Sequence, residues 1–256
     1  MKSLLAFLKK ELTEQFRAGR LTILGILFLF IGIMNPAIAK LTPWLLKIMA
    51  DSLESSGITV TDITVTAMDA WVQFFKNAPL GLLAFLLLES STFTKEYRSG
   101  SLLLVLTKGL SRWMVVVAKT AVLILLWSAC YWLSFGITDC YAAYFWDNSI
   151  VQNLTLSVTI WWLFGIWTVA LAVFWSTVAN SNTAVLCGTG STVLLSYVIG
   201  LLPKVKEYMP TLLLDGNSLI YGTAESAMYT AAICITVAMS FLCPIAGMAL
   251  FNKKQL

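Results

Sequence analysis

The chain has 256 residues, of which 59% are hydrophobic and 12% are charged, and its formal net charge is +4. A soluble domain is about half apolar and about a quarter charged, so this composition excludes a soluble enzyme, a disordered tail and a nucleic-acid-binding module. A membrane-spanning helix needs about 20 apolar residues, so the length allows six spans but no sizeable soluble domain as well.

The residue inventory also limits the chemistry of the chain. It contains no histidine and five cysteines. Without histidine, the usual zinc ligand, the usual general base and Ser-His catalysis are missing. The cysteines lie in or near apolar runs and form no CxxC motif, so we interpret them as packing residues. We therefore expect no catalytic, metal-binding or cofactor-binding residue in this chain.

The sequence begins with an amphipathic segment and continues as a series of apolar runs. Residues 1–20 are expected to form a helix in the plane of the lipid headgroups, because Leu5, Leu8, Leu12 and Phe16 recur every three to four residues. The predicted fold is all-α and polytopic. Its six spans are expected at residues 21–39, 71–91, 113–141, 151–178, 184–202 and 227–250.

The segments between the spans differ in character. Residues 40–70 are polar and acidic, which predicts an external loop with one short helix at most. Residues 92–112 form a polar loop on the opposite side, and residues 203–226 form an outer loop that we interpret as re-entrant. Tryptophans inside the spans are expected mostly to face lipid. The third span ends in an aromatic belt made of Tyr141, Tyr144, Phe145 and Trp146.

The distribution of basic residues predicts the orientation. With both termini in the cytoplasm, 12 of the 17 lysines and arginines lie on the inner side and the other 5 on the outer side or in outer half-spans. The inverted topology would reverse this ratio. We therefore expect a multi-pass protein of a bacterial plasma membrane with cytoplasmic termini.

Three charged residues lie within or beside the predicted spans, where a charge costs about 2.5–3.5 kcal/mol at mid-bilayer. Lys76 lies about one turn from the outer end of its span, and we favour outward snorkelling for it. Glu89, near the inner end of the second span, is expected to pair with a basic residue of the N-terminal helix or of the loop at residues 92–112, such as Arg17 or Arg98. Asp139 either caps the outer interface or faces a translocation path. None of the three is placed for acid–base catalysis.

The most specific motif lies between the second and third spans. It consists, in chain order, of Glu96, Gly100-Ser101-Leu102, the Leu-rich turn Leu103–Leu106, Thr107-Lys108-Gly109-Leu110-Ser111-Arg112 and Ala118-Lys119. This pattern resembles the cytoplasmic loop of ABC-2-type transporter permeases, the membrane subunits of type V ABC exporters. That loop carries Gly-Thr-Leu, Ser-Lys-Pro-x-Ser-Arg and Gly-Lys. The chain departs from it at Ser101, Gly109 and Ala118.

The resemblance implies a function and its partners. It implies an N-terminal elbow helix, a cytoplasmic coupling helix, a second permease copy and two separate ATPase chains that bind ATP and Mg²⁺. It also implies export of a hydrophobic or amphipathic substrate, such as a peptide toxin or bacteriocin, an antibiotic or a lipid-like molecule. No motor is expected in this chain itself, because the Gly-rich run Gly188–Thr192 lacks the lysine of a P-loop.

The loop itself suits a coupling role. Leu102, Leu103 and Leu106 can form an apolar docking face, and Gly109 suits a left-handed helix cap. Its basic residues either reach acidic groups of a partner or lipid phosphates, or only anchor the loop by the positive-inside rule. The expected coupling residues are Lys95, Glu96, Arg98, Gly100, Ser101, Leu102, Leu103, Leu106, Lys108, Gly109, Ser111 and Arg112.

Small residues repeat along two spans. The fifth span has Gly188, Thr192, Ser196 and Gly200 at four-residue spacing, and the first has Gly25 and Gly32 on one face. Because permeases of the resembled family dimerise largely through these two spans, we expect both faces at the homodimer and its central pathway. Packing within one subunit is the alternative.

Three other functions were weighed. An ion-driven secondary transporter predicts inverted repeats and mid-membrane carboxylates, and the sequence shows no convincing repeat. An intramembrane enzyme is disfavoured by the missing histidine and by the lack of paired carboxylates. A non-transporting membrane anchor of an ATPase-driven signalling or immunity complex stays open, because the same loop would dock its ATPase.

Overall fold

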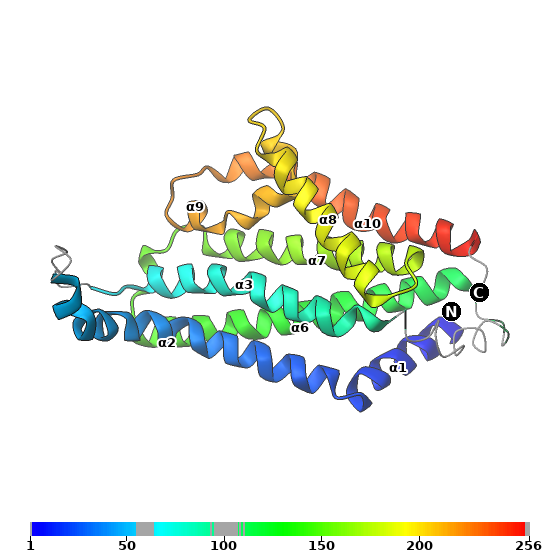
Figure 1. Cartoon of the computed structure of the whole chain (residues 1–256), viewed down its shortest axis with the longest axis horizontal. Helices are drawn as coiled ribbons and strands as arrows, with labels where there is room; N and C mark the ends of the chain where they lie inside the picture. The colour runs from blue at the N-terminus through cyan, green and yellow to red at the C-terminus, as the bar shows by residue number, and fades with distance from the viewer. Residues whose placement is uncertain are drawn as a thin grey trace.

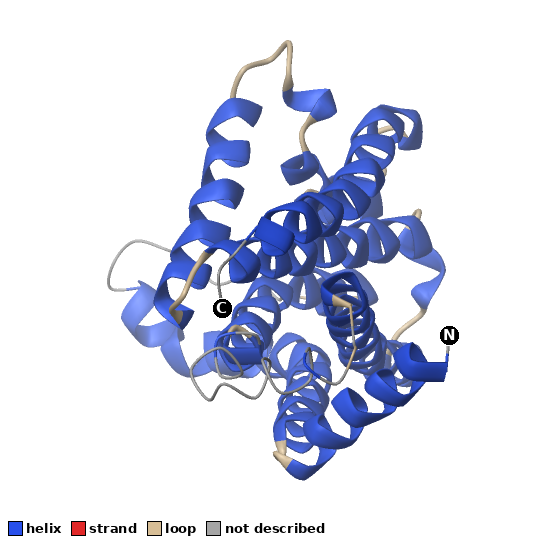
Figure 2. Ribbon diagram, turned by 90° about the vertical axis from the view of Figure 1, so that its right-hand side faces the viewer, coloured by secondary structure: helices blue, strands red, loops and turns tan. Residues whose placement is uncertain are grey.

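The computed structural model describes residues 2–54, 64–92, 94, 107, 109 and 111–253. In that part of the chain every regular element is helical, as Figure 2 shows. The α-helices are α1 (Lys2–Arg17), α2 (Arg20–Glu54), α3 (Ala67–Glu89), α6 (Arg112–Phe145), α7 (Leu154–Val178), α8 (Asn182–Gly200), α9 (Gly216–Ile220) and α10 (Thr230–Lys253). Short 3₁₀ turns are η1 (Asn148–Ile150), η2 (Lys206–Tyr208), η3 (Pro210–Leu214) and η4 (Ser226–Tyr229).

Six of these helices are long and apolar enough to cross a membrane, namely α2, α3, α6, α7, α8 and α10. The predicted all-α architecture with six spans is therefore confirmed. Figure 1 shows α2, α3, α6 and α7 running side by side, with α8 and α10 inclined to them. The start of α1 and the end of α10 lie at the same end of the bundle, as six crossings require.

The first long helix is much longer than its sequence predicted. α2 continues to Glu54, although the chain from residue 40 was expected to be an external loop. Pro36 and Pro43 lie inside this helix. The residues that follow are mainly strong helix formers such as leucine, lysine, methionine and alanine, so the helix persists beyond the apolar run. The polar residues between 40 and 54 indicated that this segment is exposed to solvent. A helix that extends beyond the bundle exposes these residues as well as a loop does.

The other long helices differ from their predicted limits by a few residues. α3 begins at Ala67, where the Thr66 backbone N–H donates to the Asp69 carboxylate over 2.8 Å in a capping box. α6 continues to Phe145, so the predicted aromatic belt forms its last turn. The loop after α8 folds into η2, η3 and α9, and it packs against α7 and α10, with Leu213 and Ile220 buried.

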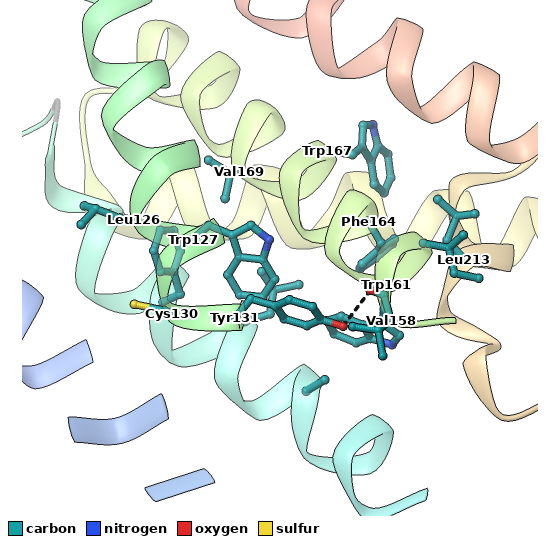
Figure 3. Packing of buried hydrophobic residues seen from close by; sticks show 14 of the residues in the cluster. Leu126, Trp127, Cys130, Tyr131, Val158, Trp161, Phe164, Trp167, Val169 and Leu213 are labelled. Atoms are coloured by element: carbon teal, nitrogen blue, oxygen red, sulfur yellow. Dashed lines mark hydrogen bonds between the residues drawn. The ribbon is translucent and has the colours of Figure 1, made fainter. Parts of the chain in front are cut away.

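The core is rich in aromatic side chains, several of which were expected to face lipid. Trp127, Trp161 and Trp167 are almost fully buried. The Tyr131 hydroxyl donates to the Val158 carbonyl over 3.0 Å, as Figure 3 shows. Trp127 fits between α6 and α7 because the facing residue is Gly165, where a Cβ would overlap the indole ring. The expectation of lipid-facing tryptophans is therefore wrong for these three.

Candidate functional site

A buried ion pair joins α1 to α6 at the end of the bundle where the termini lie. The Lys119 Nζ donates to Glu11 Oε2 over 2.8 Å, and both side chains are at most 4% exposed. Lys119 Nζ also lies 3.4 Å from the Thr92 carbonyl oxygen. Lys10 adds a partly exposed contact of 2.9 Å to the other Glu11 oxygen. A charge in this position persists only when it is paired, because an isolated buried ion is costly.

A second buried carboxylate lies beside this pair, at the end of α3. Glu89 Oε2 accepts hydrogen bonds from Gln15 Nε2 over 2.8 Å and from Thr92 Oγ1 over 2.9 Å. Arg20 Nη1 lies 3.4 Å from the same oxygen, and Arg20 Nη2 donates to Ser91 Oγ over 3.0 Å. Glu89 thereby joins the start of α2 and the inner face of α1 to the end of α3.

The structure pairs Glu89 with a basic residue of the predicted elbow segment, residues 1–20, but the residue is not Arg17. Arg17 is exposed at the end of α1, and Arg98 lies outside the described residues. The partner is Arg20, because Gly19 adopts a left-handed φ of +70° and the chain turns there into α2. This turn places the first side chain of α2, rather than the last basic one of α1, against α3.

The two carboxylates and their partners form one inner ionic cluster, defined as Glu11, Gln15, Arg20, Glu89, Thr92 and Lys119. Two of its oxygens, Gln15 Oε1 and Glu89 Oε1, are buried and have no hydrogen-bond partner among the residues that the structure describes. Glu89 and Ser90 also line a cavity of about 20 Å³ with α6 and α7, which is room for about one water molecule. The cluster can therefore accept further hydrogen bonds, and it links four helices through charged groups.

The inner ionic cluster adjoins the loop that was predicted to couple the chain to an ATPase. At one end of the loop, Thr92 belongs to the cluster, and the Thr94 hydroxyl hydrogen-bonds to the Asn182 side chain at the start of α8. At the other end, Arg112 begins α6 and donates to the Phe251 carbonyl oxygen of α10 over 2.8 Å. Both ends of the loop are thus bound to the helical bundle.

Most of the predicted coupling residues cannot be placed. Lys95, Glu96, Arg98, Gly100, Ser101, Leu102, Leu103, Leu106 and Lys108 lie outside the described residues. Gly109 has a left-handed φ of +88°, as its predicted capping role requires. Ser111 is the N-cap of α6, and its buried hydroxyl has no hydrogen-bond partner in the described part of the chain. Arg112 was expected to reach a partner or lipid phosphates, but it contacts the last carbonyls of α10.

The small residues of α8 lie against the chain's own helices. A Cβ at Gly188 would overlap the Trp175 ring, and Trp175 Nε1 donates to Thr192 Oγ1 over 3.1 Å. Ser196 is buried, and a Cβ at Gly200 would lie 3.1 Å from the Thr211 hydroxyl of η3. This placement supports the alternative, packing within one subunit, because the indole of Trp175 occupies the space that the missing side chain leaves.

The two glycines of α2 behave differently from each other. A Cβ at Gly32 would come within 2.9 Å of the Ser134 carbonyl oxygen of α6, so this glycine also packs within the subunit. A Cβ at Gly25 would meet nothing within 4 Å. Of the six residues expected at a homodimer interface, only Gly25 faces open space in the described chain.

The structure also locates Lys76 and Asp139, the other two charged residues in or beside the predicted spans. Lys76 is exposed, consistent with snorkelling. Asp139 accepts a hydrogen bond from Asn148 Nδ2 over 3.2 Å, and the same amide's Oδ1 accepts one from Trp71 Nε1 over 3.3 Å. Asp139 therefore binds the turn between α6 and α7, and this contact leaves both of its expected roles open.

A buried amide cluster was missed by sequence reasoning. Asn77 Nδ2 donates to Asn35 Oδ1 over 2.8 Å, and Asn35 Nδ2 donates to Thr138 Oγ1 over 3.0 Å. The Thr138 hydroxyl lies 3.1 Å from the Gly32 carbonyl oxygen. Pro36 cannot donate the backbone hydrogen bond that this carbonyl would otherwise accept, and the Thr138 hydroxyl, which also lies 2.9 Å from the Ser134 carbonyl oxygen, is in position to donate to it instead.

The importance of Lys119 and Glu11 was also missed, although a signal was present. Lys119 is the seventh residue of an apolar span predicted from 113, and a lysine at that depth requires a partner. Glu11 and Gln15 follow Phe7 at four-residue spacing, so they share its buried face. Among the described residues, no group of three or more His, Cys, Asp or Glu side chains is arranged to hold a metal ion.

Comparison with known proteins adds no family assignment. No protein-family model matches the chain, and no curated protein matches it.

Proposed function

We propose that this chain is the membrane subunit of an ATP-driven exporter of the ABC-2 type, working as two copies with two separate ATPase chains. The ATPases bind ATP and Mg²⁺, and the permease pair forms the path for a hydrophobic or amphipathic cargo across the plasma membrane. The observation that carries the proposal is the inner ionic cluster, which ties the start of the motif-bearing loop to α1, α2, α3 and α6.

The cluster gives the loop the mechanical property that coupling requires. An ATPase cannot drive helices through a slack loop, because the loop would absorb the displacement. Here Thr92 is hydrogen-bonded to Glu89, and Arg112 is bound to α10. A force on residues 93–111 would therefore reach the helices at both ends of the loop, and the buried charges resist separation because each would lose its partner.

The proposed second copy would meet the outward faces of α2 and α8 rather than the small-residue stripe. Only 11% of the residues in the apolar stretch of α8 are buried, and Leu194 and Leu195 are exposed on this helix. α2 exposes Ile26 and Phe30 in the same way. These faces contact either lipid or a second permease copy in the membrane.

Co-purification with an ATPase tests the proposal. The open reading frames beside the gene are searched for a P-loop ATPase, each candidate is co-expressed with the tagged chain, and the bound ATPase and its hydrolysis rate are measured. Leu102→Asp and Leu106→Asp should each reduce the bound ATPase at least about tenfold, since a charge on an apolar docking face costs several kcal/mol. Leu104→Asp is the matched control, because residue 104 lies on the opposite side of a helix from residue 102.

The outcomes separate the alternatives. If the ATPase stays bound with full activity in both variants, the coupling assignment is wrong. The anchor alternative predicts the same loss of binding but no ATP-dependent cargo movement in reconstituted vesicles. An ion-driven transporter predicts movement that follows an ion gradient without any ATPase. Hydrophobic peptides, antibiotics and labelled lipids serve as the cargo panel.

A further inference from the structure

An apolar groove with a lysine at its rim lies between α2 and α6, at the end of the bundle opposite the termini. Its volume is about 650 Å³. Ile33, Ala37 and Leu41 line it from α2, and Tyr141 lines it from α6. Lys40 is the one charged residue in its lining.

The positive charge of Lys40 is not neutralised by any described residue. Its Nζ lies 3.5 Å above the centre of the Phe145 ring, and it forms no ion pair within the described chain. The ring orients the ammonium by a cation–π contact but carries no net charge. Trp44 and Tyr141, which also line the groove, are exposed, and neither hydrogen-bonds to a described residue. The rim therefore offers a cation and two unused hydrogen-bond donors.

The depth of Lys40 places this rim at a membrane surface. Twenty residues separate Arg20 from Lys40 along α2, which is about 30 Å at 1.5 Å per residue. The hydrocarbon core of a bilayer has about the same thickness. With Arg20 at one interface, Lys40 reaches the headgroups of the other, and Ile33 and Ala37 lie deeper. Aromatic side chains such as Tyr141 and Phe145 are typical of this level.

We propose that this groove binds one anionic phospholipid of that leaflet. Its phosphate contacts Lys40, with Trp44 and Tyr141 as further donors, and its acyl chain covers Ile33 and Ala37. A zwitterionic lipid also carries a phosphate, but its own ammonium group offsets that charge, so its attraction to Lys40 is weaker. A second copy of the chain paired about this groove by a two-fold axis would bring two Lys40 side chains together, and their charges would repel. The proposal does not depend on any ATPase.

Lipid titration of the purified full-length chain tests the proposal. Binding of phosphatidylglycerol and of phosphatidylcholine with identical acyl chains is measured by native mass spectrometry in detergent. Phosphatidylglycerol should bind the wild type more tightly. Lys40→Gln should weaken that binding about fivefold, since a lysine near the surface contributes about 1 kcal/mol toward anionic lipid. Lys40→Arg should retain the preference.

Lys47→Gln is the matched control, because Lys47 is an exposed lysine seven residues further along α2 and does not line the groove. It should bind phosphatidylglycerol as the wild type does. Ala37→Phe keeps the Lys40 charge but fills the groove, so it should also weaken the binding of phosphatidylglycerol. Soluble glycerol phosphate, which has the headgroup charge without acyl chains, should not compete.

Several results would overturn the proposal. Equal losses in Lys40→Gln and Lys47→Gln would indicate diffuse attraction rather than a site. Unchanged binding in Ala37→Phe, or full competition by glycerol phosphate, would show that the groove does not hold an acyl chain. A change in oligomeric mass of either groove variant with unchanged lipid binding would assign the groove to a second copy instead.

Discussion

The Lys119 ammonium lies 2.8 Å from the Glu11 carboxylate, and this buried pair holds α1 against α6 through charge. The apolar stripe of α1 lies partly on its outer side, since Leu5 and Phe16 are each 63% exposed. On a soluble protein, an amphipathic helix turns its apolar face toward the core and its polar face toward water. In α1, apolar side chains face outward and polar side chains face inward. The arrangement suits a helix that lies in the membrane interface, with lipid outside it and the inner ionic cluster beneath it.

Breaking this pair on one side should be costly. Glu11→Leu and Lys119→Met, made separately, are each expected to lower the free energy of unfolding by about 3–5 kcal/mol, because each removes one member of a buried ion pair and leaves the other without its nearest opposite charge. The double variant should recover most of that loss, since a well-packed apolar pair replaces the ions. The free energy of unfolding of the two single variants and of the double variant is measured by SDS titration in mixed micelles.

The control for this cycle is Lys10→Met, which removes the partly exposed contact to Glu11. Lys10 is 44% exposed, so the loss should stay below about 1 kcal/mol. A double variant as unstable as the single ones would show that Glu11 and Lys119 contribute separately rather than as a pair.

Glu89 is expected to matter for both stability and coupling. Glu89→Gln removes the charge that faces Arg20 but keeps an acceptor for Gln15, and we expect a loss of about 1.5–3 kcal/mol. Glu89→Leu should be less stable still. If the chain works as proposed, the glutamine variant should bind the ATPase normally but transport less cargo per ATP hydrolysed. Normal transport by the Glu89→Gln variant would show that the inner ionic cluster is not required for coupling.

The six spans could be predicted because apolar length is a property of each segment alone. The partner of Glu89 could not, since it depends on the left-handed turn at Gly19, which decides whether Arg17 or Arg20 faces α3. The burial of Trp127 likewise depends on Gly165 in another helix. Such contacts are set by packing between helices, and a single sequence carries no direct signal for them.

The glycines of α8 provide a test of packing within the subunit. Gly188→Ala places a methyl group inside the Trp175 ring position and should cost about 1–3 kcal/mol by overpacking. Gly190→Ala is the matched control, because a Cβ there meets nothing within 4 Å. The Gly188→Ala loss should be independent of protein concentration. A concentration-dependent loss would instead indicate that Gly188 lies at a dimer interface.

Acid should weaken the inner end of the bundle slightly through Glu14. Burial acts to raise the pKa of this carboxyl, but the hydrogen bond and charge of Lys10, with Lys119 and Arg20 further away, bring the pKa below its ordinary value of 4.5. A lowered folded-state pKa gives stability that is present above the unfolded pKa and is lost as the pH falls through the folded one. Because Glu14 is 57% exposed, the effect is small.

Unfolding measured from pH 6 to about pH 3 checks this expectation. The wild type should lose more stability below about pH 4.5 than Glu14→Gln, which cannot titrate at this position. Parallel pH profiles of the two proteins would contradict the role of Glu14.

The Thr138 hydroxyl allows a sharper test, because its role depends on a proline in another helix. It lies 3.1 Å from the Gly32 carbonyl oxygen, which lost its backbone donor to Pro36. Thr138→Val should therefore cost about 1–3 kcal/mol, whereas Thr138→Ser should cost less. In a Pro36→Ala background the residue 36 N–H can bond to Gly32, so Thr138→Val should cost measurably less there. An equal cost in both backgrounds would mean that Thr138 acts through Asn35 and the Ser134 carbonyl oxygen rather than through Gly32.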